Sequence, residues 1–175
     1  AVNAGPRRQA RDFIRDQLRA GHFARFMNEY GYAMFAVDLV GMSSADPLFI
    51  ADVLTSGQIQ RLAGMYDRMH QGALNYLLLV KMMRGRFAED PIYGQYLDPT
   101  ERYYHGISQG GIFGGVYMAV SPDVQRGVLG VMGQPYAFLL NRSVDFSVFF
   151  VLILTTFPDA RDQQILVALA QNLGN

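Results

Sequence analysis

The chain has 175 residues, which suffices for one domain with a substantial hydrophobic core and is too short for two ordinary domains. Hydrophobic residues make up 50% and charged residues only 17%, and the formal net charge is +0, so binding to nucleic acid or to an anionic membrane surface is not expected. Cysteine is absent, which excludes disulfides and thiolate catalysis but indicates no compartment. We therefore expect residues 1–175 to form a single domain, and localisation stays open.

The first part of the chain predicts two short helices and a strand. In residues 9–20, apolar side chains recur at helical spacing among arginines and aspartates, which is typical of an amphipathic surface helix that ends at Gly21. Residues 22–30 form a second helical stretch. Residues 32–38 are an apolar run closed by Asp38, as in a strand that is buried on both faces.

Helical spacing dominates the middle of the chain. Apolar residues between positions 50 and 83 recur every three or four residues, which predicts one long helix or two consecutive helices. Residues 85–99 contain glycine, prolines and acids and are expected to form a loop. Residues 102–107 are aromatic and apolar enough for a buried parallel strand, and residues 110–119 predict a helix of small residues that can pack closely on a sheet.

Ser108 lies at the junction of that strand and that helix. Gly106 and Gly110 flank it in the pattern G-x-S-x-G, in which the chain reverses so sharply that larger flanking residues would collide. The hydroxyl of Ser108 would then project beside a helix N-terminus, where unpaired N–H groups favour an oxyanion. This geometry suits acyl transfer. The alternative is an ordinary strand-to-helix turn whose serine caps the helix.

Residues 126–132 predict a third strand, and residues 159–173 predict a final amphipathic helix. Strands that alternate with helices indicate an α/β fold, with a mostly parallel sheet, flanking helices and right-handed crossovers. Functional sites in such folds lie at the carboxyl ends of the strands. We therefore expect Asp38, Ser108 and Gly133 to open onto one crevice.

Two segments bear on targeting. Residues 146–157 are the longest apolar run, but they fall short of the roughly 20 residues of a membrane-spanning helix, so we predict a buried helix or one that covers a pocket or interface. Residues 1–8 lack the apolar centre and cleavage site of a signal peptide, and the chain does not begin with Met. These features are consistent with a processed or excised piece of a longer chain.

Three stretches of the sequence resemble the α/β-hydrolase superfamily. Residues 36–43 (Ala-Val-Asp-Leu-Val-Gly-Met-Ser) resemble the end of its fourth strand, residues 104–111 its nucleophile elbow, and residues 127–133 its sixth strand. The resemblance implies a partial hydrolase core of three strands, with Ser108 as nucleophile and the backbone N–H of Gln109 as half of the oxyanion hole. It further implies an esterase or lipase-like enzyme that forms an acyl-enzyme, needs no cofactor and acts on small apolar esters.

The sequence departs from the family in two respects. The general base of the family is a histidine downstream of the serine, yet no histidine follows His105 here. The strand that pairs between the fourth and fifth strands of the family is also missing, which would leave a strand edge unpaired. The chain would then be a fragment, carry a rearranged small sheet, or be completed by another copy. In the last two cases the apolar composition and the apolar run at residues 146–157 favour association, so we expect a homo-oligomer.

Other residues are candidates for a role in the chemistry. His105 is a catalytic candidate, although a packed core histidine is the simpler interpretation. Asp145 is the candidate for the acid of the triad, with a salt bridge to Arg142 as the alternative role. His70 is read as a solvated or interface residue and His22 as a helix cap, and three scattered histidines without cysteine make a zinc site unexpected. The competing interpretation of the whole chain is a non-catalytic, hydrolase-like fragment or interaction module.

Overall fold

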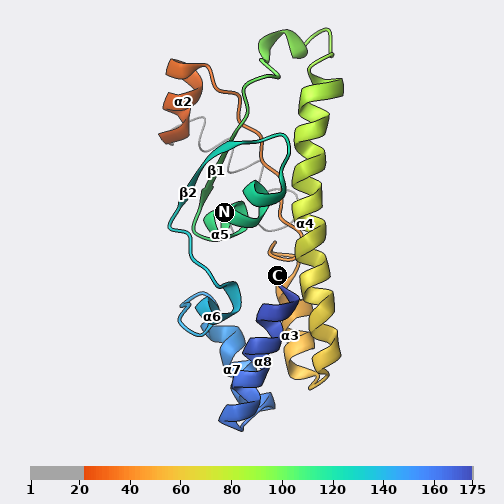
Figure 1. The fold of residues 1–175 in the computed structure, drawn as a ribbon, viewed down its shortest axis with the longest axis vertical. Coiled ribbons are helices and arrows are strands. Elements are labelled where there is room, and N and C mark those ends of the chain that lie inside the picture. Colours follow the sequence, from red (N-terminus) through yellow and green to blue (C-terminus); the bar gives the residue numbers. More distant parts are fainter. Residues whose placement is uncertain (1–21, 175) are drawn as a thin grey trace.

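The computed structural model describes residues 22–174, so the helix predicted at residues 9–20 lies outside the described residues. The described chain is elongated, with one long helix, α4, along its side (Figure 1). A unit of two strands and a helix lies against the upper half of α4, and a group of helices lies at its lower end (Figure 1). The helices are α2 (His22–Tyr30), α3 (Pro47–Thr55), η1 (Ile59–Arg61), α4 (Leu62–Met82), η2 (Met83–Phe87), η3 (Gly94–Tyr96), α5 (Gln109–Val120), α6 (Tyr136–Leu140), α7 (Ser147–Thr156) and α8 (Ala160–Leu173).

The sheet consists of two strands, β1 (Tyr103–Ile107) and β2 (Arg126–Gly130), which pair in parallel from Tyr103 opposite Arg126 to Ile107 opposite Gly130. Helix α5 connects them, which is the crossover that a parallel pair requires. One face of the sheet fits α5 closely because a glycine of the helix faces large side chains of the strands: a methyl group added at Gly114 would lie 2.5 Å from Leu129 and would also meet the ring of Tyr104. Both strands agree with the predicted segments 102–107 and 126–132.

The strand predicted at residues 32–38 is wrong. Residues 31–39 form no regular secondary structure and pair with neither strand of the sheet. The segment is instead held by scattered contacts: the hydroxyl of Tyr76 on α4 donates to the backbone carbonyl of Val37 at 3.3 Å, and the ring of Phe35 lies 5.9 Å from the ring of Phe87. Phe35 remains 44% exposed, so the run is not buried as a central strand would be.

The fold is therefore mixed α/β and 59% helical, with two parallel strands where three were predicted. It fits a partial α/β fold, but it does not contain the hydrolase core that the sequence resemblance implied. The physical reason is that the apolar run at residues 32–38 lies beside neither strand of the sheet. Without a partner strand, its backbone N–H and carbonyl groups would form no hydrogen bonds in an extended conformation.

The hydrophobic core lies at the helical end of the molecule, where α3, α4, α7 and α8 meet. Its buried members are Val53, Leu54, Leu62, Met65, Tyr66, Met69, Ile153 and Leu166. The long helical pattern predicted between residues 50 and 83 is divided here into α3 and α4, one of the two arrangements that the pattern allowed.

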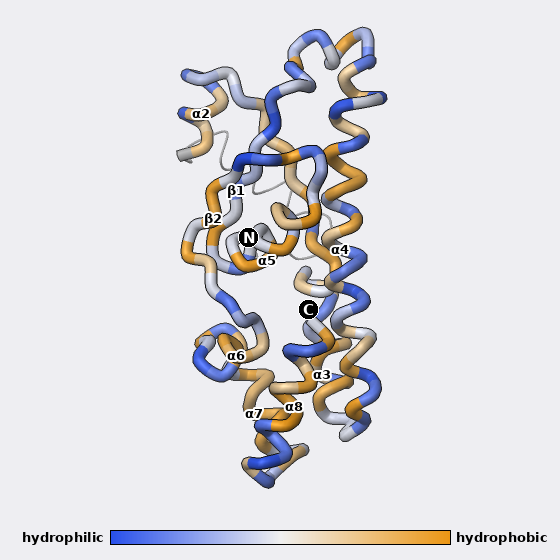
Figure 2. Tube along the Cα trace, in the orientation of Figure 1, coloured by the Kyte–Doolittle hydropathy of each residue, from blue (hydrophilic) through white to orange (hydrophobic). Residues whose placement is uncertain are grey.

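Helix α7 accounts for most of the predicted apolar helix at residues 146–157, and Figure 2 colours much of it as hydrophobic. One side of α7 faces the core, where Ile153 is 5% exposed, while Val148 and Val151 on the other side are 66% and 58% exposed. Between residues 22 and 174, no helix combines the length and the hydropathy needed to cross a membrane.

Candidate active site at Ser108

Ser108 occupies a strained position between the last residue of β1 and the first residue of α5. Its backbone angles are φ 55° and ψ −118°, a combination that L-residues rarely adopt. The turn is fixed to the sheet because the N–H of Ser108 donates to the carbonyl of Gly130 at 2.9 Å. The strain is thus held in place by the end of β2, and strained residues of this kind cluster at functional sites.

The glycines around Ser108 are required by close backbone contacts. A methyl group added at Gly106 would lie 2.5 Å from the carbonyl carbon of Gly110 and closer still to its oxygen. A methyl group added at Gly111 would lie 2.5 Å from the carbonyl oxygen of Gly130. The steric reason that the sequence pattern gave for the first glycine of G-x-S-x-G is therefore confirmed at Gly106.

Ser108 is exposed and is the N-cap residue of α5, but its side chain forms no capping hydrogen bond, so the hydroxyl does not have the role that the helix-cap interpretation gave it. The first intrahelical donors are the N–H groups of Gly111 and Ile112, which both donate to the carbonyl of Ser108, at 2.8 Å and 3.0 Å. The N–H groups of Gln109 and Gly110 have no acceptor among residues 22–174. Two unpaired donors at the positive end of a 12-residue helix thus lie next to the hydroxyl.

Tyr104 supports the turn from behind. Its hydroxyl donates to the carbonyl of Gly110 at 2.7 Å, and its ring lies 5.2 Å from the ring of Tyr117 on α5. Burial, with Tyr76 and Tyr117 nearby, raises the pKa of Tyr104 above its ordinary value, so the phenol stays neutral and remains a donor. The sequence analysis missed this role, because an aromatic residue in a strand reads only as core.

The loop that follows residues 31–39 reaches the start of α5. The side-chain amide of Gln109 contacts the sulfur of Met42, and the hydroxyl of Tyr136 approaches the same sulfur at 3.6 Å. On the other side, Met132 lies along α5, since a methyl group added at Gly111 would be 3.3 Å from its Cβ. The segments that follow Asp38 and β2 therefore both contact the first turns of α5, although the parallel strand that was predicted to end at Asp38 does not form.

Asp46 holds that loop in shape. It is 1% exposed and accepts hydrogen bonds from the N–H of Gly41 at 3.0 Å, the N–H and hydroxyl of Ser43 at 2.9 Å and 2.7 Å, and the guanidinium of Arg68 at 2.7 Å. Burial acts to raise the pKa of Asp46, but the hydrogen bonds from Ser43 and Arg68 outweigh it, and the pKa is lowered. Asp46 was not singled out from the sequence, although Ser43 three residues before it is a common local hydrogen-bonding pattern.

The structure does not bring the predicted histidine to the serine. His105 lies on β1 with an exposed side chain, and its ring packs edge-on against Phe23 of α2 at 4.7 Å. No hydrogen bond between His105 and Ser108 is present in the described part of the chain. His70 is exposed on α4, and His22 begins α2 where a C-terminal cap was expected.

Asp145 is also separated from Ser108. It is exposed in the turn between α6 and α7, which lies with the helices at the lower end of the molecule in Figure 1. The alternative salt bridge with Arg142 does not form either. The described residues contain no cluster of three or more His, Asp or Glu side chains that could hold a metal ion.

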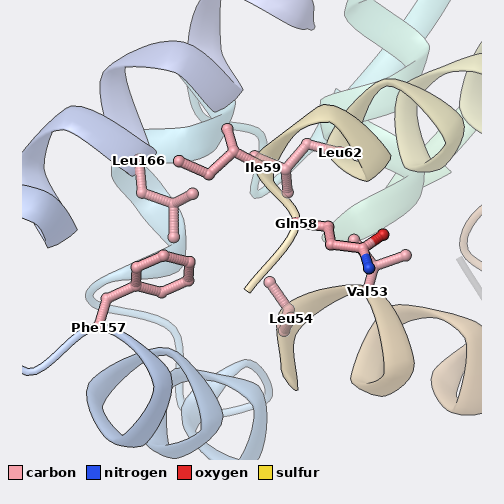
Figure 3. A pocket seen from close by; sticks show the side chains of 7 residues that line it. All are labelled: Val53, Leu54, Gln58, Ile59, Leu62, Phe157 and Leu166. Atoms are coloured by element: carbon pink, nitrogen blue, oxygen red, sulfur yellow. The ribbon is translucent and has the colours of Figure 1, made fainter. Parts of the chain in front are cut away.

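An apolar pocket lies in the helical end rather than at Ser108. Figure 3 shows Leu166 and Phe157 facing Leu54, Ile59 and Leu62 across it. Apart from Gln58, its lining has no polar side chain and so offers no group for catalysis. The candidate site is therefore the exposed turn at Ser108, where the serine lies beside two backbone N–H groups that have no acceptor among residues 22–174.

In comparisons with known proteins, no protein family, no curated protein and no solved structure matches the chain. The site is thus defined by its own geometry, a parallel β-α-β unit with an exposed, strained serine at the first turn of its helix.

Proposed function

We propose that the protein is a serine-dependent carboxylic ester hydrolase that acts through an acyl-enzyme on Ser108. The observation that carries the proposal is the strained conformation of Ser108, φ 55° and ψ −118°, with its hydroxyl exposed and uncapped. A serine that only terminated a strand would adopt a relaxed conformation and donate to, or cap, its neighbours. No cofactor is needed for this chemistry.

In the proposed reaction the Oγ atom of Ser108 attacks the ester carbonyl carbon, and the carbonyl oxygen becomes an oxyanion. The unpaired N–H groups of Gln109 and Gly110 are placed to donate to that oxyanion. Collapse of the tetrahedral intermediate breaks the bond to the alcohol, which leaves with a proton, and water then releases the acid from the serine. One such donor is worth about 3–4 kcal/mol of transition-state stabilisation in serine proteases.

The proposal requires a base to accept the proton of Ser108. Since neither His70, which is exposed on α4, nor His105, which packs against Phe23, forms a hydrogen bond with Ser108 in the described structure, we propose that the base comes from a second polypeptide. A second copy of the chain, through its His70 or His22, is the simplest source. A homo-oligomer would also cover apolar side chains that the described structure leaves exposed, such as Val128 at 60% and Val148 at 66%. Replacing both histidines by alanine would then reduce ester hydrolysis and leave the chain folded.

The proposal is tested by labelling the purified protein with a fluorophosphonate probe and locating the adduct by mass spectrometry. The serine oxygen forms a bond to phosphorus, fluoride leaves, and the serine proton passes to solvent. We expect one adduct per chain at Ser108, absent from Ser108→Ala. Ser44→Ala is the matched control, because Ser44 is also exposed but lies in an ordinary loop. No adduct in the wild type, or an adduct that persists in Ser108→Ala, would refute the nucleophile.

The second candidate function is a non-catalytic interaction module. It is favoured by one observation, the absence of a hydrogen-bonded base at Ser108 in the described residues. Hydrolysis of short p-nitrophenyl esters by the wild type, and its loss in Ser108→Ala, would exclude this alternative. Equal rates in the two proteins would support it.

A further inference from the structure

Val131 is the second strained residue of the molecule. Across residues 22–174, positive φ angles at residues other than glycine occur at Ser108 and at Val131, whose φ is 52°. The two are directly linked, because Val131 follows Gly130 and the carbonyl of Gly130 accepts the N–H of Ser108 at 2.9 Å. Both strained residues therefore lie at the carboxyl end of the two-stranded sheet.

The packing of the protein does not explain a valine at this position. A β-branched residue at positive φ is unfavourable, and glycine would adopt the same conformation without the steric penalty. The side chain of Val131 buries little apolar surface that could offset this penalty, since the residue is 82% exposed. Its isopropyl group is thus presented to solvent, one residue beyond the carbonyl that accepts the N–H of Ser108, and the strained backbone makes this costly in stability.

The described segments around the first turns of α5 carry little charge. The three segments that meet at the first turns of α5, residues 39–45, 108–120 and 127–141, contain no Asp, Glu, Lys or Arg. Next to Val131, Met132 is 44% exposed, and its Cε would contact a methyl group added at Gly115 at 3.5 Å, so it extends along the helix. An apolar side chain bound beside Ser108 would meet Val131 and Met132 without desolvating a charge.

We propose that Val131 is a specificity-determining residue that contacts the acyl chain of the substrate, and that the substrates are esters of uncharged acids with an aliphatic chain of several carbons. This inference rests on the proposed function of Ser108. Binding of the substrate would depend on contact between its acyl chain and the isopropyl group of Val131, which the strained backbone holds at the edge of the site. Charged acyl groups are disfavoured because nothing in the three segments would pair with them.

The test compares the rates at which fluorophosphonates with a methyl and an octyl chain label Ser108, in the wild type and in Val131→Gly. We expect the octyl probe to lose about tenfold in rate while the methyl probe changes by less than twofold, because only the octyl chain is long enough to contact the isopropyl group. Val131→Gly also relieves the backbone strain, so its melting temperature should rise by a few degrees. Val144→Gly is the control, since Val144 is 87% exposed in the α6–α7 turn and should change neither rate ratio.

The outcomes separate this inference from the proposed function. Labelling of Ser108 with the same octyl-to-methyl ratio in the wild type and Val131→Gly would overturn the role of Val131 and leave the nucleophile intact. Failure of both probes to label Ser108 in the wild type would overturn both proposals. A lower melting temperature in Val131→Gly would show that the valine stabilises the fold, and it would remove the argument from strain.

Discussion

Replacing Gly106 with alanine tests the steric basis of the serine turn. The added methyl group would lie 2.5 Å from the carbonyl carbon of Gly110, whereas real Cβ atoms stay beyond 3.0 Å, so the backbone must separate by about 0.5 Å or more. The atom that has to move belongs to the first turn of α5 and is no flexible side-chain end. The movement would also disturb the hydrogen bond from the hydroxyl of Tyr104 to the carbonyl of Gly110.

The expected loss of stability follows from these two effects. Overpacking of a closely fitted site costs about 1–3 kcal/mol. Loss of the hydrogen bond from Tyr104 adds about 1 kcal/mol. We therefore expect Gly106→Ala to lower the free energy of unfolding by about 2–4 kcal/mol, a large share of the roughly 5–15 kcal/mol typical of a domain.

Urea unfolding followed by circular dichroism measures this change, and Gly115→Ala is the matched control. Gly115 lies on α5, the helix that Gly106 contacts, but a methyl group there meets the Cε of Met132 at an ordinary 3.5 Å. Because alanine favours a helix over glycine, Gly115→Ala should be neutral or stabilising by up to about 1 kcal/mol. Equal unfolding free energies for the two variants would show that the contact between Gly106 and Gly110 does not constrain the turn.

Four further predictions concern the support of the site and the assembly. Asp46→Ala should cost about 2–4 kcal/mol, since it leaves the buried N–H of Gly41 without an acceptor and Arg68 without its carboxylate, and urea unfolding would measure it. Because the pKa of Asp46 is lowered in the folded protein, ionised Asp46 stabilises the fold fully at pH values above its ordinary pKa of 3.8, and this stabilisation is lost as the pH falls through the folded pKa. The wild type should therefore lose more unfolding free energy than Asp46→Asn between about pH 5 and pH 2. Tyr104→Phe should lower the unfolding free energy by about 1 kcal/mol and slow phosphonate labelling of Ser108, whereas unchanged labelling would mean that the phenol does not support the turn. Light scattering at micromolar concentration should give a mass above that of one chain, through an interface of roughly 800 Å² per partner, and a monomer mass would refute this.

The part of the fold that the sequence predicted correctly is the part governed by contacts between neighbours in the chain. Strand β1, Ser108, helix α5 and strand β2 were all expected where they are found, because alternation of apolar runs, glycines and turns carries that information. The sharp turn at Ser108 was expected from its flanking glycines, whereas the strained backbone angles of the serine were not predicted.

The parts that the sequence could not predict depend on distant partners. The apolar run at residues 32–38 has the composition of a strand, but a strand forms only where another offers paired N–H and carbonyl groups, and none lies beside it in the described chain. His105 and Asp145 were chosen by their order along the chain, and the fold places one against Phe23 and the other between α6 and α7. The strain at Val131 gave no signal, because valine is common after a strand.

The continuity of the β1-α5-β2 unit has a consequence for the order of folding. Every residue from Tyr103 to Gly130 belongs to one uninterrupted stretch, and the hydrogen bond that fixes Ser108 joins two residues of that stretch. Closing short loops costs less conformational entropy than joining distant segments, so this unit can form before the helical end has assembled. Ser108 would then acquire its unusual backbone geometry early, during a local event, and the remainder of the chain would fold around a turn that is already in place.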